Sequence, residues 1–193
     1  MSLSTTIIVV GVSGVGKSTL IQSVASEIPS CRHVQASHLL KNALKAQAEE
    51  LRLGAVLDNQ KVLIDAFQKV RALAEDVILL DAHCIVDSDH GIEIIPEAVF
   101  RSLEPTGFVE VWDEPGAVAL RRVLDAKRVR PARDEVTIRN HQTLSSETVE
   151  QYAAQIGVPL VRVQSGDAVG FMAAVKAFCS PGIRALGGAP SSC

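Results

Sequence analysis

Aromatic residues are scarce in this chain of 193 residues, which contains five Phe, one Trp and one Tyr. A protein that stacks nucleic-acid bases on its surface needs more aromatic side chains than this. The formal net charge is -3 and the isoelectric point is about 5.9, so the chain also lacks the basic excess of a protein that coats nucleic acid. We therefore expect no nucleic-acid partner.

Long apolar runs are absent as well. None approaches the length needed to cross a membrane, and the first residues do not form the charged segment and apolar segment of a secretion signal. The four cysteines show none of the spacings typical of metal or redox sites. These observations predict a cytoplasmic protein with reduced thiols and without a membrane partner.

The chain does contain enough apolar sequence for one substantial core, with 47% hydrophobic and 21% charged residues. Apolar runs predict strands at 6–10, 33–35, 77–80, 108–112 and 159–163. Helical spacing predicts helices at 19–28, 36–51, 58–75, 115–127, 134–156 (with an internal break) and 167–178. This alternation predicts an α/β fold in which a parallel sheet carries helices on both faces.

The most informative motif is a glycine-rich loop directly after the first predicted strand. It consists of Gly11, Val12, Ser13, Gly14, Val15, Gly16, Lys17, Ser18 and Thr19. A strand before the loop and a helix after it predict a nucleoside-triphosphate site, because loop N–H groups and the helix N-terminus bind phosphates. Lys17 is expected to reach the outer phosphates and Ser18 to bind Mg²⁺. The alternative, a glycine-rich turn with a solvated lysine, fits this context poorly.

A second part of the site is predicted at Asp81, which ends the apolar run at 77–80. Its carboxylate is expected at the carboxyl edge of the sheet beside the loop, where it would support Mg²⁺. An Asp that merely forms a turn is the alternative. His83 is expected at the same edge, either as a substrate contact or as a capping or hydrogen-bonding residue.

Basic residues are concentrated at the end of the helix predicted at 115–127 and just beyond it. They are Arg121, Arg122, Lys127, Arg128, Arg130 and Arg133. Arginines on a mobile segment can neutralise a phosphoryl group during transfer and exclude water from it. Arg128 and Arg130 are the candidates for such a lid, at about 127–134, and Arg139 is a further candidate. A solvated basic helix end is the alternative, above all for Arg121 and Arg122.

The helical segment at about 37–75 lies between the second and third predicted strands, where P-loop kinases cover the phosphoryl acceptor. It carries Lys41, Arg52 and Gln60, any of which could hold an acceptor phosphate or base. Solvated helix faces are the alternative for each of them taken alone. The kinase domain is expected to span 1–179, followed by a flexible tail rich in Gly, Pro and Ser at 180–193.

With these motifs, the chain resembles adenylate kinases of the archaeal type, a branch of the P-loop nucleoside monophosphate kinases. The resemblance extends from about residue 6 to residue 175 and includes the phosphate loop, Asp81-Ala82-His83, the arginine cluster and His141-Gln142. It implies a P-loop NTPase fold with a five-stranded parallel sheet, an acceptor-binding helical insert and a short lid. It also implies ATP and Mg²⁺ as cofactors, AMP as the phosphoryl acceptor, and a homo-oligomer.

Two positions depart from the pattern of that family. Its lid usually reads Arg-x-Arg-Asp, whereas Pro131 follows Arg130 here and the next arginine is Arg133. A later helix usually carries an arginine where Ser146 stands, and Arg139 is placed to compensate. The acceptor segment aligns only with gaps, so the resemblance is weakest in the part that chooses the substrate.

Three functions remain open at this point. The leading one is transfer of the γ-phosphoryl group of ATP to AMP by in-line displacement without a covalent intermediate. The second is a P-loop kinase with a hydroxyl acceptor on a small molecule, for which Asp81 would double as the base. The third is an ATP-binding regulatory protein that has the loop but no acceptor site.

Overall fold

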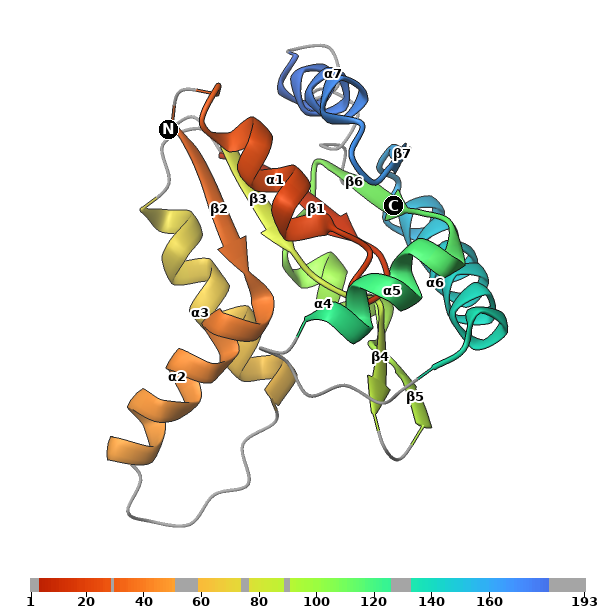
Figure 1. Ribbon diagram of the computed structural model, residues 1–193. Coiled ribbons are helices and arrows are strands. Elements are labelled where there is room, and N and C mark those ends of the chain that lie inside the picture. Colours follow the sequence, from red (N-terminus) through yellow and green to blue (C-terminus); the bar gives the residue numbers. More distant parts are fainter. Residues whose placement is uncertain are drawn as a thin grey trace.

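The computed structural model describes residues 4–28, 30–50, 59–73, 77–88, 91–125 and 133–180. In these ranges a central sheet lies between helices, and a helix pair and a small hairpin extend away from it (Figure 1). No helix of the described ranges is both long enough and apolar enough to cross a membrane.

The central sheet has five parallel strands in the order β2, β3, β1, β6, β7. Their bounds are Cys31–Gln35 for β2, Val77–Asp81 for β3, Thr5–Val10 for β1, Gly107–Trp112 for β6 and Leu160–Gln164 for β7. The predicted α/β fold with a five-stranded parallel sheet is confirmed, including the weak strand at 33–35. Because β1 and β3 are neighbours, the residues that follow their carboxyl ends meet at one edge of the sheet.

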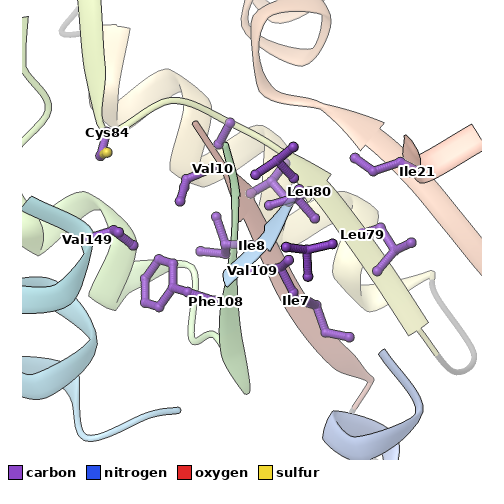
Figure 2. Close-up of a cluster of buried hydrophobic side chains, with 14 of the residues drawn as sticks. Ile7, Ile8, Val10, Ile21, Leu79, Leu80, Cys84, Phe108, Val109 and Val149 are labelled. Carbon is purple, nitrogen blue, oxygen red and sulfur yellow. The ribbon is translucent and has the colours of Figure 1, made fainter. Parts of the chain in front are cut away.

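The core is built on the two central strands, β1 and β3, whose residues are buried along their whole length. Figure 2 shows Ile7 and Ile8 of β1 beside Leu79 and Leu80 of β3, with Phe108 of β6 near them. Ile7 pairs with Leu79 and Ile8 with Leu80 in the parallel register. Continuous apolar strands of this kind need cover on both faces, and the helices provide it.

One face of the sheet is covered by α1 (Lys17–Ala25) and α7 (Ala168–Cys179), which contact each other (Figure 1). The opposite face is covered by α4 (Glu97–Ser102) and α6 (Glu135–Ile156), and α5 (Pro115–Leu124) packs against α6. Two further helices, α2 (Ala36–Glu50) and α3 (Asn59–Ala72), pack together and project beyond the edge of the sheet at β2. This pair corresponds to the predicted helical insert.

The break predicted inside the helix at 134–156 is wrong, because α6 is continuous. Its polar middle has low intrinsic helix propensity, but Ile138 and Val149 are both fully buried and fix the same helix against the core. Asp134 caps its start by accepting a hydrogen bond from Thr137 N at 2.8 Å. Gly157 ends it in the left-handed conformation, with φ 82°.

Two strands form an antiparallel hairpin that the sequence did not predict, β4 (Ile85–Ser88) and β5 (Gly91–Ile94). The helix α4 was missed as well. The strands have four residues each and α4 has six, so none of them is long enough to develop a periodic pattern. The hairpin follows soon after β3 and projects from the same edge as the phosphate loop (Figure 1).

Candidate active site

The glycine-rich loop joins β1 to α1 at the carboxyl edge of the sheet. Gly11, Gly14 and Gly16 have φ values of 144°, 82° and 110°, which residues with side chains rarely adopt. Gly16 directly precedes α1, so loop N–H groups and the positive end of the helix are close together. A glycine-rich loop directly before a helix N-terminus is typical of phosphate-binding sites.

Lys17 begins α1, and its side chain is only 5% exposed. Its Nζ donates to the carbonyl oxygens of Gly11 at 2.8 Å and Val12 at 3.3 Å. The same Nζ lies 3.0 Å from Nε2 of His83. An ammonium group can only donate, so His83 accepts through Nε2 when Lys17 is charged. The positive charge is thereby held over the loop.

Asp81 ends β3 beside the loop, and its side chain is 8% exposed. Ser18 donates its hydroxyl to Oδ2 at 2.5 Å, and Nζ of Lys17 lies 3.9 Å from Oδ1. Burial on its own would raise the pKa of this carboxyl group. His33, whose Nε2 lies 3.9 Å from Oδ2, the charge of Lys17 and the hydrogen bond from Ser18 outweigh burial and lower the pKa to about 2. Asp81 is therefore ionised at any physiological pH.

The hydroxyl of Ser18 and the carboxylate of Asp81 form an oxygen pair that fits Mg²⁺, a cation that binds few protein ligands and takes its other ligands from phosphates and water. Within the described ranges, no three His, Cys, Asp or Glu side chains gather into a group that could hold a metal without such help. A magnesium ion at this position would thus depend on a bound nucleotide.

A cleft of about 540 Å³ opens in front of these groups. It is lined by Gly14, Gly16, Lys17, Ser18, Thr19, Gln35, Ser37, Asp81, His83, Arg121 and Asp125. Sequence reasoning did not assign Gln35, Ser37 or Asp125 to the site. Gln35 could have been predicted from the sequence, because it ends the parallel strand β2 and ligands bind at the carboxyl ends of such strands.

Arg121 also lines this cleft, although the sequence left it with the solvated end of a helix. Its guanidinium donates to the hydroxyl of Ser165 at 3.0 Å and forms an ion pair with Asp113. Burial tends to raise the pKa of Asp113, but its hydrogen bonds, above all from Arg121, lower it. The next residue, Arg122, donates to the carbonyl oxygen of Ser13 in the phosphate loop at 2.8 Å. Both arginines are thus anchored beside the loop.

Three other predicted contact residues lie away from the cleft. Lys41 on α2 and Arg139 on α6 are exposed, Gln60 on α3 is half-buried, and none of the three lines the cleft. Ser146, which stands where an arginine was expected, donates instead to the buried carboxylate of Glu110 at 3.0 Å.

Some of the predicted features lie outside the described residues. These are Arg52, the lid residues Arg128 and Arg130, and the tail from residue 181 onward.

Comparison with curated proteins finds relatives over most of the chain. An adenylate kinase from Pyrococcus furiosus is 27% identical over 178 residues, which cover 88% of this chain and 91% of that protein. An adenylate kinase from Methanoculleus marisnigri is 29% identical over 171 residues, covering 82% of this chain and 88% of that protein.

Solved structures share the fold at low sequence identity. A sugar kinase from a Janibacter species has a TM-score of 0.54 and 13% identity, with 93% of this chain and 98% of that chain covered. A shikimate kinase from Bacteroides thetaiotaomicron has a TM-score of 0.50 and 16% identity, with 90% and 95% covered. These similarities support a P-loop kinase fold.

The protein-family comparison covers the site itself. Residues 10–139 match the family model described as an AAA domain, and this range includes the phosphate loop, Asp81, His83 and Arg121. The chain therefore belongs to this AAA domain family of P-loop proteins.

Proposed function

We propose that this protein transfers the γ-phosphoryl group of ATP to a nucleoside monophosphate, with AMP as the leading acceptor. The observation that carries the phosphoryl-transfer part is the cluster of Lys17, Ser18 and Asp81 at one edge of the sheet. The choice of acceptor is supported by similarity to proteins named adenylate kinase over 88% of the chain.

In the proposed reaction, the loop N–H groups and Lys17 bind the phosphates of ATP, and Ser18 and Asp81 hold Mg²⁺. The bound metal would neutralise charge on the phosphate oxygens. An oxygen of the acceptor phosphate forms a bond to the γ-phosphorus while the bond from that phosphorus to the β–γ bridging oxygen breaks. Both products are then nucleoside diphosphates. The protein contributes positioning and charge, and no residue forms a covalent bond to the phosphoryl group.

Arginines would supply the remaining positive charge. Arg121 and Arg122 are anchored beside the loop, and the side chain of Arg122 is only 6% exposed. We propose that Arg128 and Arg130 of the lid close over the transferring group, as the sequence predicts. A guanidinium group is suited to this role because it presents several donors in a fixed plane.

A kinase with a hydroxyl acceptor is the second candidate, and one feature of the cleft favours it. Gln35 and Ser37 line the cleft, and Oε1 of Gln35 is buried without a hydrogen-bond partner among the described residues. An amide and a hydroxyl are suitable groups for binding a polyol. The sugar kinase and the shikimate kinase share only the fold with this chain and do not decide between the acceptors.

The reverse reaction tests the proposal most sharply. Incubation of the protein with Mg²⁺ and ADP alone should give equal amounts of ATP and AMP, which chromatography separates. A kinase for a hydroxyl acceptor, or a regulatory ATP-binding protein, has no way to make ATP from ADP alone. Forward assays with AMP, GMP, CMP, UMP, shikimate and gluconate would then rank the acceptors. The Lys17→Ala variant is the control for contaminating kinases, and failure with every nucleotide would refute the proposal.

A further inference from the structure

A carboxylate in the β4–β5 hairpin holds two arginines, one of which contacts the phosphate loop. Asp87, in β4, is 9% exposed. Its Oδ2 accepts from Nη1 of Arg122 at 3.3 Å. Its Oδ1 accepts from Nε of Arg133 at 3.3 Å and from Nη2 of Arg133 at 3.0 Å. One acidic side chain thus bridges α5 and Arg133, which lies two residues before α6.

Arg122 is fixed from two sides. Nε donates to the carbonyl oxygen of Ser13 in the phosphate loop, while Nη1 donates to Asp87. Its stem crosses the loop at Gly14, where a Cβ atom would lie only 2.8 Å from Cγ of Arg122. Two hydrogen bonds from different nitrogens of one guanidinium fix the orientation of its plane. The arginine is therefore oriented before any nucleotide binds.

The cluster is largely shielded from solvent. The side chain of Arg122 is 6% exposed and that of Asp87 is 9% exposed. His141 lies close by, with Nδ1 3.7 Å from Oδ2 of Asp87, which is too long for a hydrogen bond. Hydrogen bonds between charged groups are stronger in such a setting than in water.

We propose that Asp87 is a positioning residue for phosphoryl transfer, because it holds Arg122 against the phosphate loop, where the phosphates of ATP are proposed to bind. This inference rests on the proposed function. Preorganised donors stabilise a transition state most effectively because they need not reorganise during the reaction. The hairpin begins four residues after Asp81, so Asp87 also links the strand that carries the proposed metal-binding carboxylate to Arg122 at the loop.

Asp87→Asn removes the charge and keeps the shape, and Asp87→Glu keeps the charge. The control is Glu104→Gln, because Glu104 forms a 2.6 Å ion pair with Arg71 and lines neither the cleft nor the loop. In Asp87→Asn, kcat for transfer to AMP should fall about tenfold or more, while the Kd for ATP changes less than about threefold. Asp87→Glu should recover part of kcat, and Glu104→Gln should match wild type.

A structural role alone would give another pattern. If kcat in Asp87→Asn stayed within about twofold of wild type, or fell only in proportion to ATP binding, the positioning role would be refuted. Thermal melting of each variant, measured without nucleotide, shows whether a loss of kcat reflects a loss of folded protein. If Asp87→Asn is less well folded, Asp87→Glu, which keeps the charge, shows whether the lost charge or the lost folding lowers kcat.

The arginine side chains provide a readout that does not depend on the acceptor. In ¹⁵N NMR spectra, the Nε–H signal of Arg133 should shift and exchange faster with solvent in Asp87→Asn, because its acceptor has lost its charge. Suppose that wild type transfers no phosphoryl group to AMP while the Arg133 signal still changes in Asp87→Asn. That result would refute the proposed function but support the hydrogen bonds from Arg122 and Arg133 to Asp87. An unchanged signal would overturn the bridge whatever the acceptor.

Discussion

Replacing Asp81 by Asn separates the charge of this residue from its shape. The pKa of Asp81 lies at about 2 in the folded protein, against an ordinary value of 3.8. Burial alone would raise this pKa, and the lowering comes from His33, Lys17 and Ser18. Because a difference of one in pKa corresponds to about 1.4 kcal/mol, the ionised carboxylate contributes about 2 kcal/mol to the free energy of unfolding.

The lowered pKa determines the pH range in which this contribution acts. It is complete above the ordinary pKa of 3.8 and is lost as the pH falls through about 2. The free energy of unfolding of wild type should therefore drop by about 2 kcal/mol more than that of Asp81→Asn between about pH 5 and pH 2. Urea unfolding at several pH values, without nucleotide or metal, measures both curves.

The same variant tests the metal site. An amide oxygen is a weaker ligand for Mg²⁺ than a carboxylate, so Asp81→Asn should need far more Mg²⁺ for phosphoryl transfer and should not reach the wild-type rate. Activity is measured across a magnesium titration at fixed ATP. Wild-type activity at every magnesium concentration would mean that Asp81 only forms a turn. Identical pH dependence of unfolding would refute the argument from its pKa.

Three further predictions concern the loop and the lid. Lys17→Ala should abolish phosphoryl transfer in a steady-state assay while circular dichroism still shows the native fold; wild-type turnover would refute the central assignment. Gly14→Ala and Gly157→Ala both force alanine to a φ of 82°, at a cost of roughly 1–2 kcal/mol in thermal or urea unfolding. Only Gly14→Ala should also lose transfer, because its methyl group would meet an arginine side chain at 2.8 Å, whereas nothing lies within 4 Å at Gly157. Arg128→Ala and Arg130→Ala should each lower kcat roughly 10²–10³-fold with little change in an ATP-binding titration, since one preorganised donor is worth about 2.7–4 kcal/mol; normal turnover in both would remove them from the lid.

The parallel sheet could be predicted because its signals are local. The strands β1 and β3 are short runs of β-branched and aliphatic residues, which predict buried neighbouring strands but not the observed register of Ile7 with Leu79. The β4–β5 hairpin could not be predicted in this way. Each of its strands has four residues, with Asp and Ser in one and Gly in the other. It is held by packing of Ile85 and Ile92 on the core and by contacts of Asp87 with distant arginines, and sequence periodicity does not record such contacts.

The same distinction applies to the site. The positions of Lys17 and Asp81 could be predicted because each residue lies at a defined distance from a strand end. Arg121 and Arg122 looked like an ordinary basic helix end, and their positions depend on Ser165, which is 44 positions from Arg121, and on Ser13, which is 109 positions from Arg122. Spacing along the chain carries no information about such partners.

The titratable groups beside the phosphate loop also bear on the choice of acceptor. A hydroxyl acceptor benefits from a general base, and the most effective base has a pKa near the working pH. Asp81 is a poor candidate, since its pKa is about 2 and its carboxylate already accepts from Ser18. Nε2 of His83 is engaged with Nζ of Lys17 at 3.0 Å. A nucleoside monophosphate needs no such base, because its phosphate oxygens are largely ionised at neutral pH. The chemistry of Asp81 and His83 thus supports the proposed phosphate acceptor.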